Sequence, residues 1–461
     1  MAAPLKADLR NSIFDGMFSN IFATLTGGVF LTGFALYLRM NEFMIGLIAA
    51  IPFFVTIFQL PISYLIGENG RRKRIALWGS ALARMIWLPI LIVTLLPVAS
   101  HMTRILIILA LIFLSHACAS VSYVSWLSWI SELVPENVRG RFFGTRNMFS
   151  GVSGIISLVL FGKVLDTLQG QTWGTLPLGF GLIFVSAVFF GMVSLFFLRR
   201  LSDPAPSSSE EVREIAAQKP RLSPLKEVNF RRFIIFAFFW NFAVYFGSPF
   251  FTLYFLRDLH YSYGFVAALG MASAFADLLG MKVWGMISDR VKNKAVMQLT
   301  SWVAIFLPLG WATVSRESFI WPIILHIIGG GFWAGMTLCT NNLLLKISPR
   351  NNCAVYFSIY NITAGLGAAI SPIVAGYLLH HVSGMTFQVF SLTLVPLQGI
   401  FIISTLLRFI SFRLFKYVDE PDAVPVKLVV RVLRSIRGLN TATGFTNILH
   451  PFIAVRRRHD Q

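Results

Sequence analysis

The sequence predicts an all-α integral membrane protein in which twelve transmembrane helices form two six-helix parallel repeats. Three observations lead to this fold class: the composition, a series of long apolar segments, and an internal repeat. Hydrophobic residues make up 56% of the chain and charged residues 13%, and the mean hydropathy is +0.70. Soluble domains usually carry about 25% charged residues, so this composition is typical of a protein that lies in a lipid bilayer.

Twelve apolar segments are each long enough to cross the hydrocarbon core, which requires about 20 residues of helix. Runs of this length without alternation do not fit the strands of a membrane barrel, which span about 10 residues with alternating polarity. We therefore expect helices near 12–38, 43–66, 75–97, 104–131, 143–165, 174–198, 231–256, 263–287, 295–314, 319–345, 354–378 and 387–411.

The chain contains an internal repeat. The segment VPENVRGRFFGTRNMFSGVSG begins at Val134, and a diverged copy, SPRNNCAVYFSIYNITAGLG, begins at Ser348. The start of the chain shows a second match, at an offset of 218, which aligns Arg39 with Arg257. Each half has six spans. Because six is an even number, both halves enter the membrane from the same side. The repeat is therefore parallel, and its axis lies along the membrane normal.

This repeat divides the chain into four parts. We expect an N-terminal six-helix bundle at 1–198, a cytoplasmic linker at 199–230, a C-terminal six-helix bundle at 231–412 and a basic cytoplasmic tail at 413–461. The linker is polar, rich in proline and serine, and charged with both signs. These properties are typical of a solvated connector between two membrane domains.

The net charge of +19 is explained by where the basic residues lie. With the N-terminus inside, 31 of the 39 lysines and arginines fall on the inner side and 5 on the outer side. This asymmetry follows the positive-inside rule, so we expect both termini in the cytoplasm and the protein in the plasma membrane, or the inner membrane if the source is bacterial. A nucleic-acid partner is not needed to explain the charge. The three cysteines predict neither a disulfide framework nor a metal site, and we expect no cofactor.

A loop motif connects the chain to a known family. The pattern G-x-x-x-D-[RK]-x-G-[RK]-[RK] appears in part after the second span of each half. The second half has Gly285, Asp289 and Arg290, whereas the first half has Gly70 and the two arginines after it but Gly67 in place of the aspartate. With these motifs and its twelve spans, the chain resembles the major facilitator superfamily of secondary transporters over about 410 residues.

The resemblance implies that these loops form a cytoplasmic gate between the halves. Asp289 can pair with basic groups and with the amide end of a helix, and the first half can use Glu68 or Glu132 against Arg139 or Arg141. The alternative is that the basic residues only orient the chain in the membrane. The gate candidates are Gly70, Arg71, Arg72, Arg139, Arg141, Gly285, Asp289 and Arg290.

Ionisable residues inside the membrane are costly and mark functional sites. Asp277 lies near the middle of the eighth predicted span, and Arg84 lies deep in the third. We take both as coupling candidates, with Asp277 as the carboxylate that gains and loses a proton during transport; a structural ion pair is the alternative for Asp277. Asp15 falls in the first turn of its predicted helix, and we expect it at the membrane interface.

The resemblance also implies that the first and fourth spans of each half line a central cavity. Serines and threonines in such spans can equally bond helices together. Aromatic and amide side chains with little charge favour a neutral or amphiphilic small solute. The expected lining residues are Asn20, Tyr123, Trp126, Trp240, Asn241, Tyr245, Trp333, Thr337 and Asn341.

These observations predict a secondary active transporter that moves a small solute by alternating access, coupled to protons. The alternative is a transporter fold reused as a membrane sensor or assembly scaffold. An enzyme is not expected, because the sequence shows no metal-ligand spacing, no nucleophile beside a histidine and an acid, and no nucleotide loop. The expected partners are the small-molecule substrate and the bilayer, with the amphipathic segment 427–437 of the tail on anionic inner-leaflet lipids. We expect a monomer.

Overall fold

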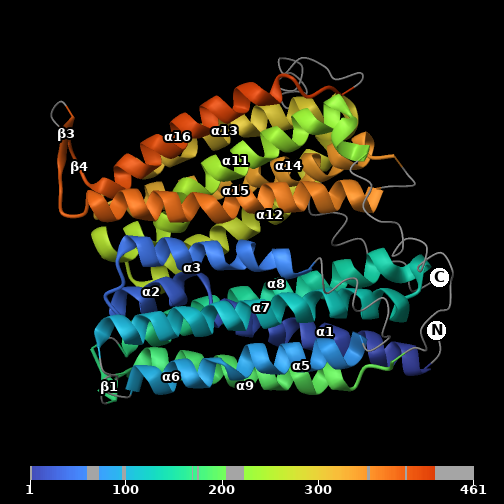
Figure 1. Cartoon of the computed structure of the whole chain (residues 1–461), viewed down its shortest axis with the longest axis horizontal. Coiled ribbons are helices and arrows are strands. Elements are labelled where there is room, and N and C mark those ends of the chain that lie inside the picture. Colours follow the sequence, from blue (N-terminus) through green and yellow to red (C-terminus); the bar gives the residue numbers. More distant parts are fainter. Residues whose placement is uncertain are drawn as a thin grey trace, which may run out of the picture.

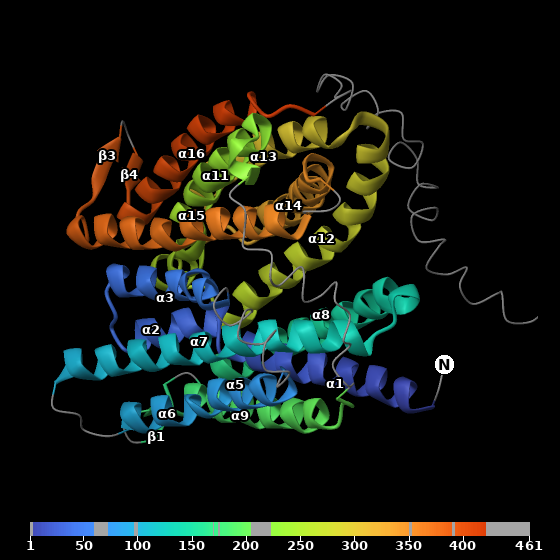
Figure 2. The same ribbon diagram turned by 45° about the vertical axis from the view of Figure 1, so that its right-hand side comes forward.

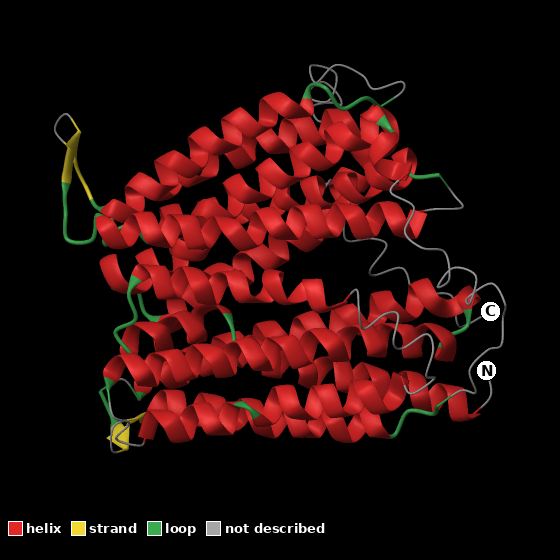
Figure 3. Cartoon of the chain, in the orientation of Figure 1, coloured by secondary structure: helices red, strands yellow, loops and turns green. Residues whose placement is uncertain are grey.

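A computed structural model describes residues 3–59, 72–95, 100–168, 170–173, 176–203, 223–349, 353–389 and 392–420. Within these residues, eleven helices are long and apolar enough to cross a membrane, and the apolar stretch Glu42–Phe58 is a shorter one that ends beside the undescribed segment 60–71. The helices lie side by side along one direction (Figure 1; Figure 3). This is the helical membrane fold that the sequence predicts.

The helices of the first half follow the predicted spans, with two of the spans interrupted. A break before Gly28, whose φ is 48°, separates α1 from α2, because glycine adopts this backbone conformation without strain. A second break near Ile86 separates α5 from α6. The elements are α1 (Ala3–Leu25), α2 (Gly28–Tyr37), α3 (Glu42–Phe54) with η1 (Val55–Phe58), α5 (Arg72–Met85), α6 (Trp87–Leu95), α7 (His101–Leu133), α8 (Glu136–Thr167), β1 (Thr172–Trp173), β2 (Leu176–Pro177) and α9 (Leu178–Arg199).

The second half repeats this order of long helices. A short π-helical turn, η3, extends the first of them, and a hairpin precedes the last. The elements are η2 (Ser223–Lys226), α11 (Val228–Leu253), η3 (Tyr254–Asp258), α12 (Tyr263–Val291), α13 (Asn293–Ala312), α14 (Ile320–Ile347), α15 (Cys353–His381), β3 (Phe387–Val389), β4 (Leu392–Leu394) and α16 (Pro396–Phe415).

Three of the predicted helix starts were wrong, among them that of α8, which begins at Glu136 instead of residue 143. α1 begins at Ala3 instead of residue 12, so Asp15 lies inside the helix and not in its first turn. The last span begins at Pro396 instead of residue 387, because residues 387–394 contain the antiparallel pair β3 and β4. An apolar run by itself does not distinguish a strand from a helix, and this run is also rich in β-branched and aromatic residues.

We call the end of the molecule where α1 begins and α16 ends the inner end, and the opposite end, which carries β1 and β3, the outer end (Figure 1). In the first half α1 packs on α8 and α9, and α5 packs on α7. In the second half α11 packs on α15 and α16, and α14 packs on α12 and α13. The most extensive contacts between the halves are those of α3 with α15 and of α8 with α12, and α2 also touches α11 and α12.

The chain that leaves the last helix of the first half bonds back to three other helices. The backbone amide of Ser202 donates to the Asp8 carboxylate of α1 at 3.0 Å, and its carbonyl accepts from the Trp129 indole of α7 at 3.0 Å. Lys73 of α5 donates to the carbonyl of Leu201. We call these contacts the first inner clasp.

The second half has an equivalent clasp. Asp419 exchanges two backbone hydrogen bonds with the side chain of Asn229, next to the start of α11, at 2.7 and 2.8 Å. The buried carboxylate of Glu420 accepts from Asn293 and the Lys294 amide at the start of α13, and from Lys346 of α14. Each clasp therefore ties the first, third and fourth spans of its half, although the residues that make it differ.

Candidate functional site

The halves contact each other closely along α3 and α15. A side-chain carbon added at Gly46 would overlap the carbonyl oxygen of Pro372, and one added at Gly376 would lie 2.6 Å from the carbonyl oxygen of Glu42. Glycines at both positions let the two helix backbones approach, as small residues do in membrane helix pairs. The ring of Phe53 also contacts Tyr245 of α11 at 4.5 Å between centroids.

An ion pair crosses between the halves at the outer end. The Arg257 guanidinium in η3 donates to the Glu42 carboxylate of α3 at 2.7 Å and to its own neighbour Asp258 at 2.9 Å. The hydroxyl of Ser383, which follows α15, also donates to Glu42 at 3.3 Å. Glu42 is buried, so its charge is stabilised by groups that belong to the other half.

A second acidic residue joins the halves at the same end. Both carboxylate oxygens of Asp166, near the end of α8, accept from the first backbone amides of α12: the amides of Tyr263 and Gly264, each at 2.7 Å. The first amides of a helix have no partner within the helix and favour negative charge. Asp166 therefore caps a helix of the opposite half, and we call Glu42, Arg257, Ser383, Asp166 and the capped amides the outer gate.

The contacts between α8 and α12 gather toward the outer end. Gly162 lies against Gly264 and Ala267, and Leu158 contacts Gly270. Figure 2 shows α12 beginning beside α8 and α2 and rising away from α8 toward its inner end. Met148 and Val152, on the inner part of α8, are about half exposed. The described part of the molecule is thus held together at the outer end and spread at the inner end between these two helices.

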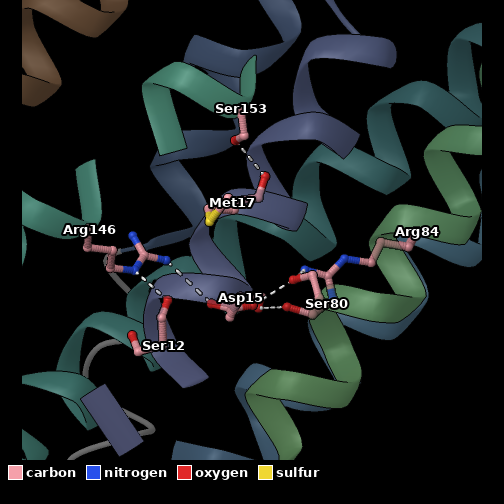
Figure 4. Close-up of polar contacts among 9 residues, drawn as sticks. Ser12, Asp15, Met17, Ser80, Arg84, Arg146 and Ser153 are labelled. Carbon is pink, nitrogen blue, oxygen red and sulfur yellow. Dashed lines mark hydrogen bonds and ion pairs between the residues drawn. The ribbon is translucent and has the colours of Figure 1, made fainter. Parts of the chain in front are cut away.

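A buried polar network connects four helices of the first half (Figure 4). One oxygen of Asp15 in α1 accepts from the Ser194 hydroxyl of α9 at 2.6 Å, and the other accepts from Arg146 of α8 at 3.4 Å. Arg84 of α5 donates to the same Ser194 at 2.9 Å. Arg146 thus binds the carboxylate directly, and Arg84 is linked to it through Ser194; both Asp15 and Arg84 are buried.

The first-half cavity candidates surround this network. The Arg146 guanidinium also lies 4.3 Å from the Trp126 ring, and Trp126 stacks on Tyr123 at 6.1 Å. Asn20 donates to the carbonyl of Ser150 in α8 at 2.7 Å. Tyr123 is 54% exposed, whereas Trp126 is buried. Of these three candidates, Tyr123 presents the most accessible surface.

The second-half candidates separate into two groups. Trp240 is buried in the core of its half beside Phe236, and the amide of Asn241 donates to Ala237 of its own helix. Tyr245 is half-buried and contacts Phe53 of the other half.

The α14 candidates form the second group. Trp333, Thr337 and Asn341 are exposed, and a spacing of four residues places them on one face of the helix. These three side chains form a continuous accessible stripe.

The two coupling candidates differ in their surroundings. Asp277 on α12 is half-buried, and the structure shows no hydrogen bond or ion pair to it from the described residues. Arg84 belongs to the Asp15 network and is held there by Ser194. Sequence reasoning missed Asp15 and Arg146 as a pair, since it placed Asp15 at the membrane interface and gave Arg146 no role.

The inner-loop candidates are partly visible. Gly70 and Arg71 lie outside the described residues, as does the tail segment 427–437. Arg72 forms an ion pair with Glu132 within the first half, and Arg139 donates to the carbonyl of Ser131 at 2.8 Å. Among the inner-loop candidates that the structure describes, Arg141, Asp289 and Arg290 are exposed, and Gly285 lies one turn before Asp289 on α12.

A polar cavity of about 450 Å³ lies beside Asp289 at the inner end of the second half. Its lining comes from α12, α13, α14 and the second clasp, and includes Lys292, Asn342, Lys346 and Glu420. The cavity belongs to one half, so Asp289 faces a space within that half in this conformation.

Comparisons with known proteins agree with this architecture. The solved structures similar to the chain include a D-xylose-proton symporter, with a TM-score of 0.66, 13% identity and coverage of 92% of this chain and 100% of the other. The nucleoside transporter NupG has a TM-score of 0.64 and 14% identity, with coverage of 90% of this chain and 100% of the other. A bacterial homologue of the iron transporter ferroportin in an inward-facing state has a TM-score of 0.67 and 11% identity, with coverage of 91% of this chain and 100% of the other. A search of curated proteins by sequence gave no match.

The family is shown by the sequence itself. A family model described as Major Facilitator Superfamily matches residues 14–352 and 257–454. The two matches together span most of the chain, so this integral multi-pass membrane protein belongs to the Major Facilitator Superfamily, as the loop motifs and the repeat indicated.

Proposed function

We propose that the protein is a secondary active transporter that moves a small solute across the membrane by alternating access. The observation that carries the proposal is the outer gate, in which Glu42 and Asp166 of one half bind groups of the other. These contacts are polar, so they can break and reform as the halves change their relative orientation. Membership of the superfamily supports the same mechanism.

We assign the structure to the inward-facing state. The distribution of lysines and arginines favours an inner end in the cytoplasm, with both termini there and the protein in the plasma membrane. With that orientation, the closed gate lies on the outer side and the separation of α8 from α12 opens toward the cytoplasm. The fold similarity to a ferroportin homologue solved in an inward-facing state supports this assignment.

The accessible candidates favour a neutral or amphiphilic substrate. Tyr123 on α7 offers an exposed ring, and the α14 stripe of Trp333, Thr337 and Asn341 offers an aromatic surface, a hydroxyl and an amide. Rings and neutral hydrogen-bonding groups are typical of binding pockets for small organic molecules. Neutral polar groups of this kind would bind a solute without adding charge.

We further propose that proton transfer at Asp277 couples transport to the proton gradient. A carboxylate that accepts no hydrogen bond from the described residues can change its charge without breaking a hydrogen-bond network among them. Asp15 differs, since its two oxygens already bind Ser194 and Arg146. Asp277 is therefore the better candidate for a group that is protonated on one side and deprotonated on the other.

The proposal is tested with purified protein in proteoliposomes that carry a pH gradient, screened for uptake of sugars, nucleosides, amphiphilic drugs and metabolites. We expect uptake of at least one solute above that of empty vesicles. The Asp277→Asn variant should keep exchange of that solute while losing accumulation driven by the gradient. Absence of uptake with every solute, from protein shown to be folded, would support the sensor or scaffold alternative instead.

A further inference from the structure

Arg408 is a buried cation on α16 that the transport proposal does not use. Its neighbours Leu406 and Ile410 are more than half exposed, whereas Arg408 itself is 4% exposed. The helix therefore presents an apolar face outward and directs this arginine into the second half. A charged group in such a place is costly unless other groups compensate it.

The compensation does not come from an acid. Arg84, the buried arginine of the first half, shares the Asp15 carboxylate through Ser194. For Arg408 the structure shows no ion pair with any described acidic residue. Its Nη1 instead donates to the carbonyl oxygen of Ala304 on α13 at 2.6 Å, and its buried Nε has no hydrogen-bond partner among the described residues.

The acceptor at Ala304 is free because of a proline one turn later. In an α-helix the carbonyl of residue 304 would accept from the backbone amide of residue 308. Residue 308 is Pro308, inside α13, and proline has no N–H to donate. Inside a membrane an unsatisfied carbonyl is costly, so the guanidinium supplies the hydrogen bond that the proline removes.

The same side of α16 also holds α11. Arg408 Nη2 lies 3.4 Å from the carbonyl oxygen of Val244, and the hydroxyl of Ser404 donates to the carbonyl of Ala243 at 2.7 Å. The next residue of α11 is Tyr245, whose ring contacts Phe53 of the first half. A chain of contacts therefore runs from the proline of α13 to a residue at the boundary between the halves.

We propose that Arg408 is a positioning residue for transport. It completes the hydrogen bonding of α13 and ties α13 and α16 to α11, so that the three helices move as one body and Tyr245 keeps its position against Phe53. This inference rests on the proposed function for its role in transport, while the helix contacts themselves do not depend on it.

The test combines Arg408→Leu, Pro308→Ala and the double variant, with Arg413→Leu as a matched control. Arg413 is an exposed arginine of the same helix. Arg408→Leu should lower the midpoint of thermal unfolding by roughly 3 °C or more, and Arg413→Leu should change it little. Pro308→Ala restores an N–H for Ala304, so Arg408→Leu should lower the midpoint less in that background. If Arg408→Leu lowers the unfolding midpoint equally in the native protein and in Pro308→Ala, the proposal that Arg408 binds the carbonyl freed by Pro308 is refuted.

Positioning is tested separately by spin labels at Met102→Cys and Ile320→Cys, on the outer ends of α7 and α14, in a background without the native cysteines. Arg408→Leu should broaden the distance distribution between the labels, and Arg408→Lys, which keeps one donor group, should broaden it less. Loss of stability with an unchanged distribution would make Arg408 a structural residue only. Because neither measurement needs a substrate, a failed uptake screen would reject the transport proposal and leave these results interpretable.

Discussion

The carboxylate of Glu42 and the guanidinium of Arg257 lie 2.7 Å apart, although 215 positions separate them and they belong to different halves. The glutamate is buried and the arginine is about one-third exposed. A pair of this kind stabilises the conformation in which the outer ends touch, and it is lost when they separate. In the proposed transport cycle the contact would act on the equilibrium between conformations more than on folding.

The first prediction concerns this pair. Glu42→Gln removes the charge while keeping the size of the side chain, so the outer gate should weaken by about 1 kcal/mol, the value of a partly exposed ion pair. This corresponds to roughly a fivefold shift toward the outward-open state, measured by the reactivity of a cysteine placed near the outer gate. Asp258→Asn is the control, because Asp258 contacts Arg257 from the same half. Equal effects of the two variants would show that the contact between the halves does not stabilise the closed outer end more than the contact within the second half does.

The second prediction concerns Asp166. Asp166→Ala leaves the first amides of α12 without their acceptor, and Asp166→Asn keeps an acceptor without the charge. Both should open the outer gate in the same cysteine assay, the alanine variant by more. Loss of a helix cap costs about 1 kcal/mol. Unchanged reactivity in the alanine variant would mean that water replaces the carboxylate without loss.

The third prediction concerns the buried network of the first half. Asp15→Asn leaves Arg84 and Arg146 without a counter-charge and should destabilise the protein by about 3 kcal/mol, as breaking a buried pair does. Arg84→Met removes one of two cations and should be milder. Combining it with Asp15→Asn should recover part of the loss. Thermal unfolding in detergent measures all three variants. If Arg84→Met proves as damaging as Asp15→Asn, the excess of positive charge is not the cause.

Asp277→Asn provides the contrast for that experiment. The structure shows no hydrogen bond from the described residues to Asp277, so its replacement by an isosteric amide should leave the unfolding midpoint nearly unchanged. A loss comparable to that of Asp15→Asn would reveal a structural role and weaken the coupling proposal for Asp277.

The fourth prediction concerns the second inner clasp. Glu420→Gln keeps one acceptor oxygen but loses the charge that pairs with Lys346 and caps α13. We expect faster hydrogen exchange at the starts of α13 and α11, with the first half unaffected. Lys346→Met should change the exchange at α13 less, because the amide of Lys294 would still be capped. Exchange that stays at the native level in Glu420→Gln would show that the clasp does not hold these helix ends.

The fold was predictable because long apolar segments leave few alternatives in a membrane. Composition, span count and the repeat at Val134 and Ser348 indicated the family, which the family match confirmed. The hairpin at 387–394 was missed since an apolar run next to a span was read as part of that span, although its β-branched and aromatic residues favour a strand. The early start of α1 was missed because the charged residues Lys6, Asp8 and Arg10 interrupt the apolar run. Their helix is stabilised by contacts such as Asp8 with Ser202 that span most of the first half.

The site was less predictable, because it depends on which residues of distant segments meet. The repeat aligned Arg39 with Arg257, yet the residue that pairs with Arg257 is Glu42, which no local pattern singles out. Asp166 caps α12 of the other half, and this role could be predicted only by knowing that α8 and α12 touch. Depth alone selected Asp277 and Arg84, and whether either couples transport stays a prediction.

The central claim is that the two halves open alternately at the outer end and at the inner end. Two distances between spin labels, measured in the same set of variants, test this claim most directly. One pair reports the outer ends, at Met102→Cys and Ile320→Cys, and the other reports the inner ends, at Asn137→Cys and Leu345→Cys. Combining Glu42→Gln with Asp166→Asn should lengthen the outer distance and shorten the inner one, since opening one side closes the other. An inner distance that stays fixed or lengthens while the outer one lengthens would contradict alternating access and indicate that the halves simply separate.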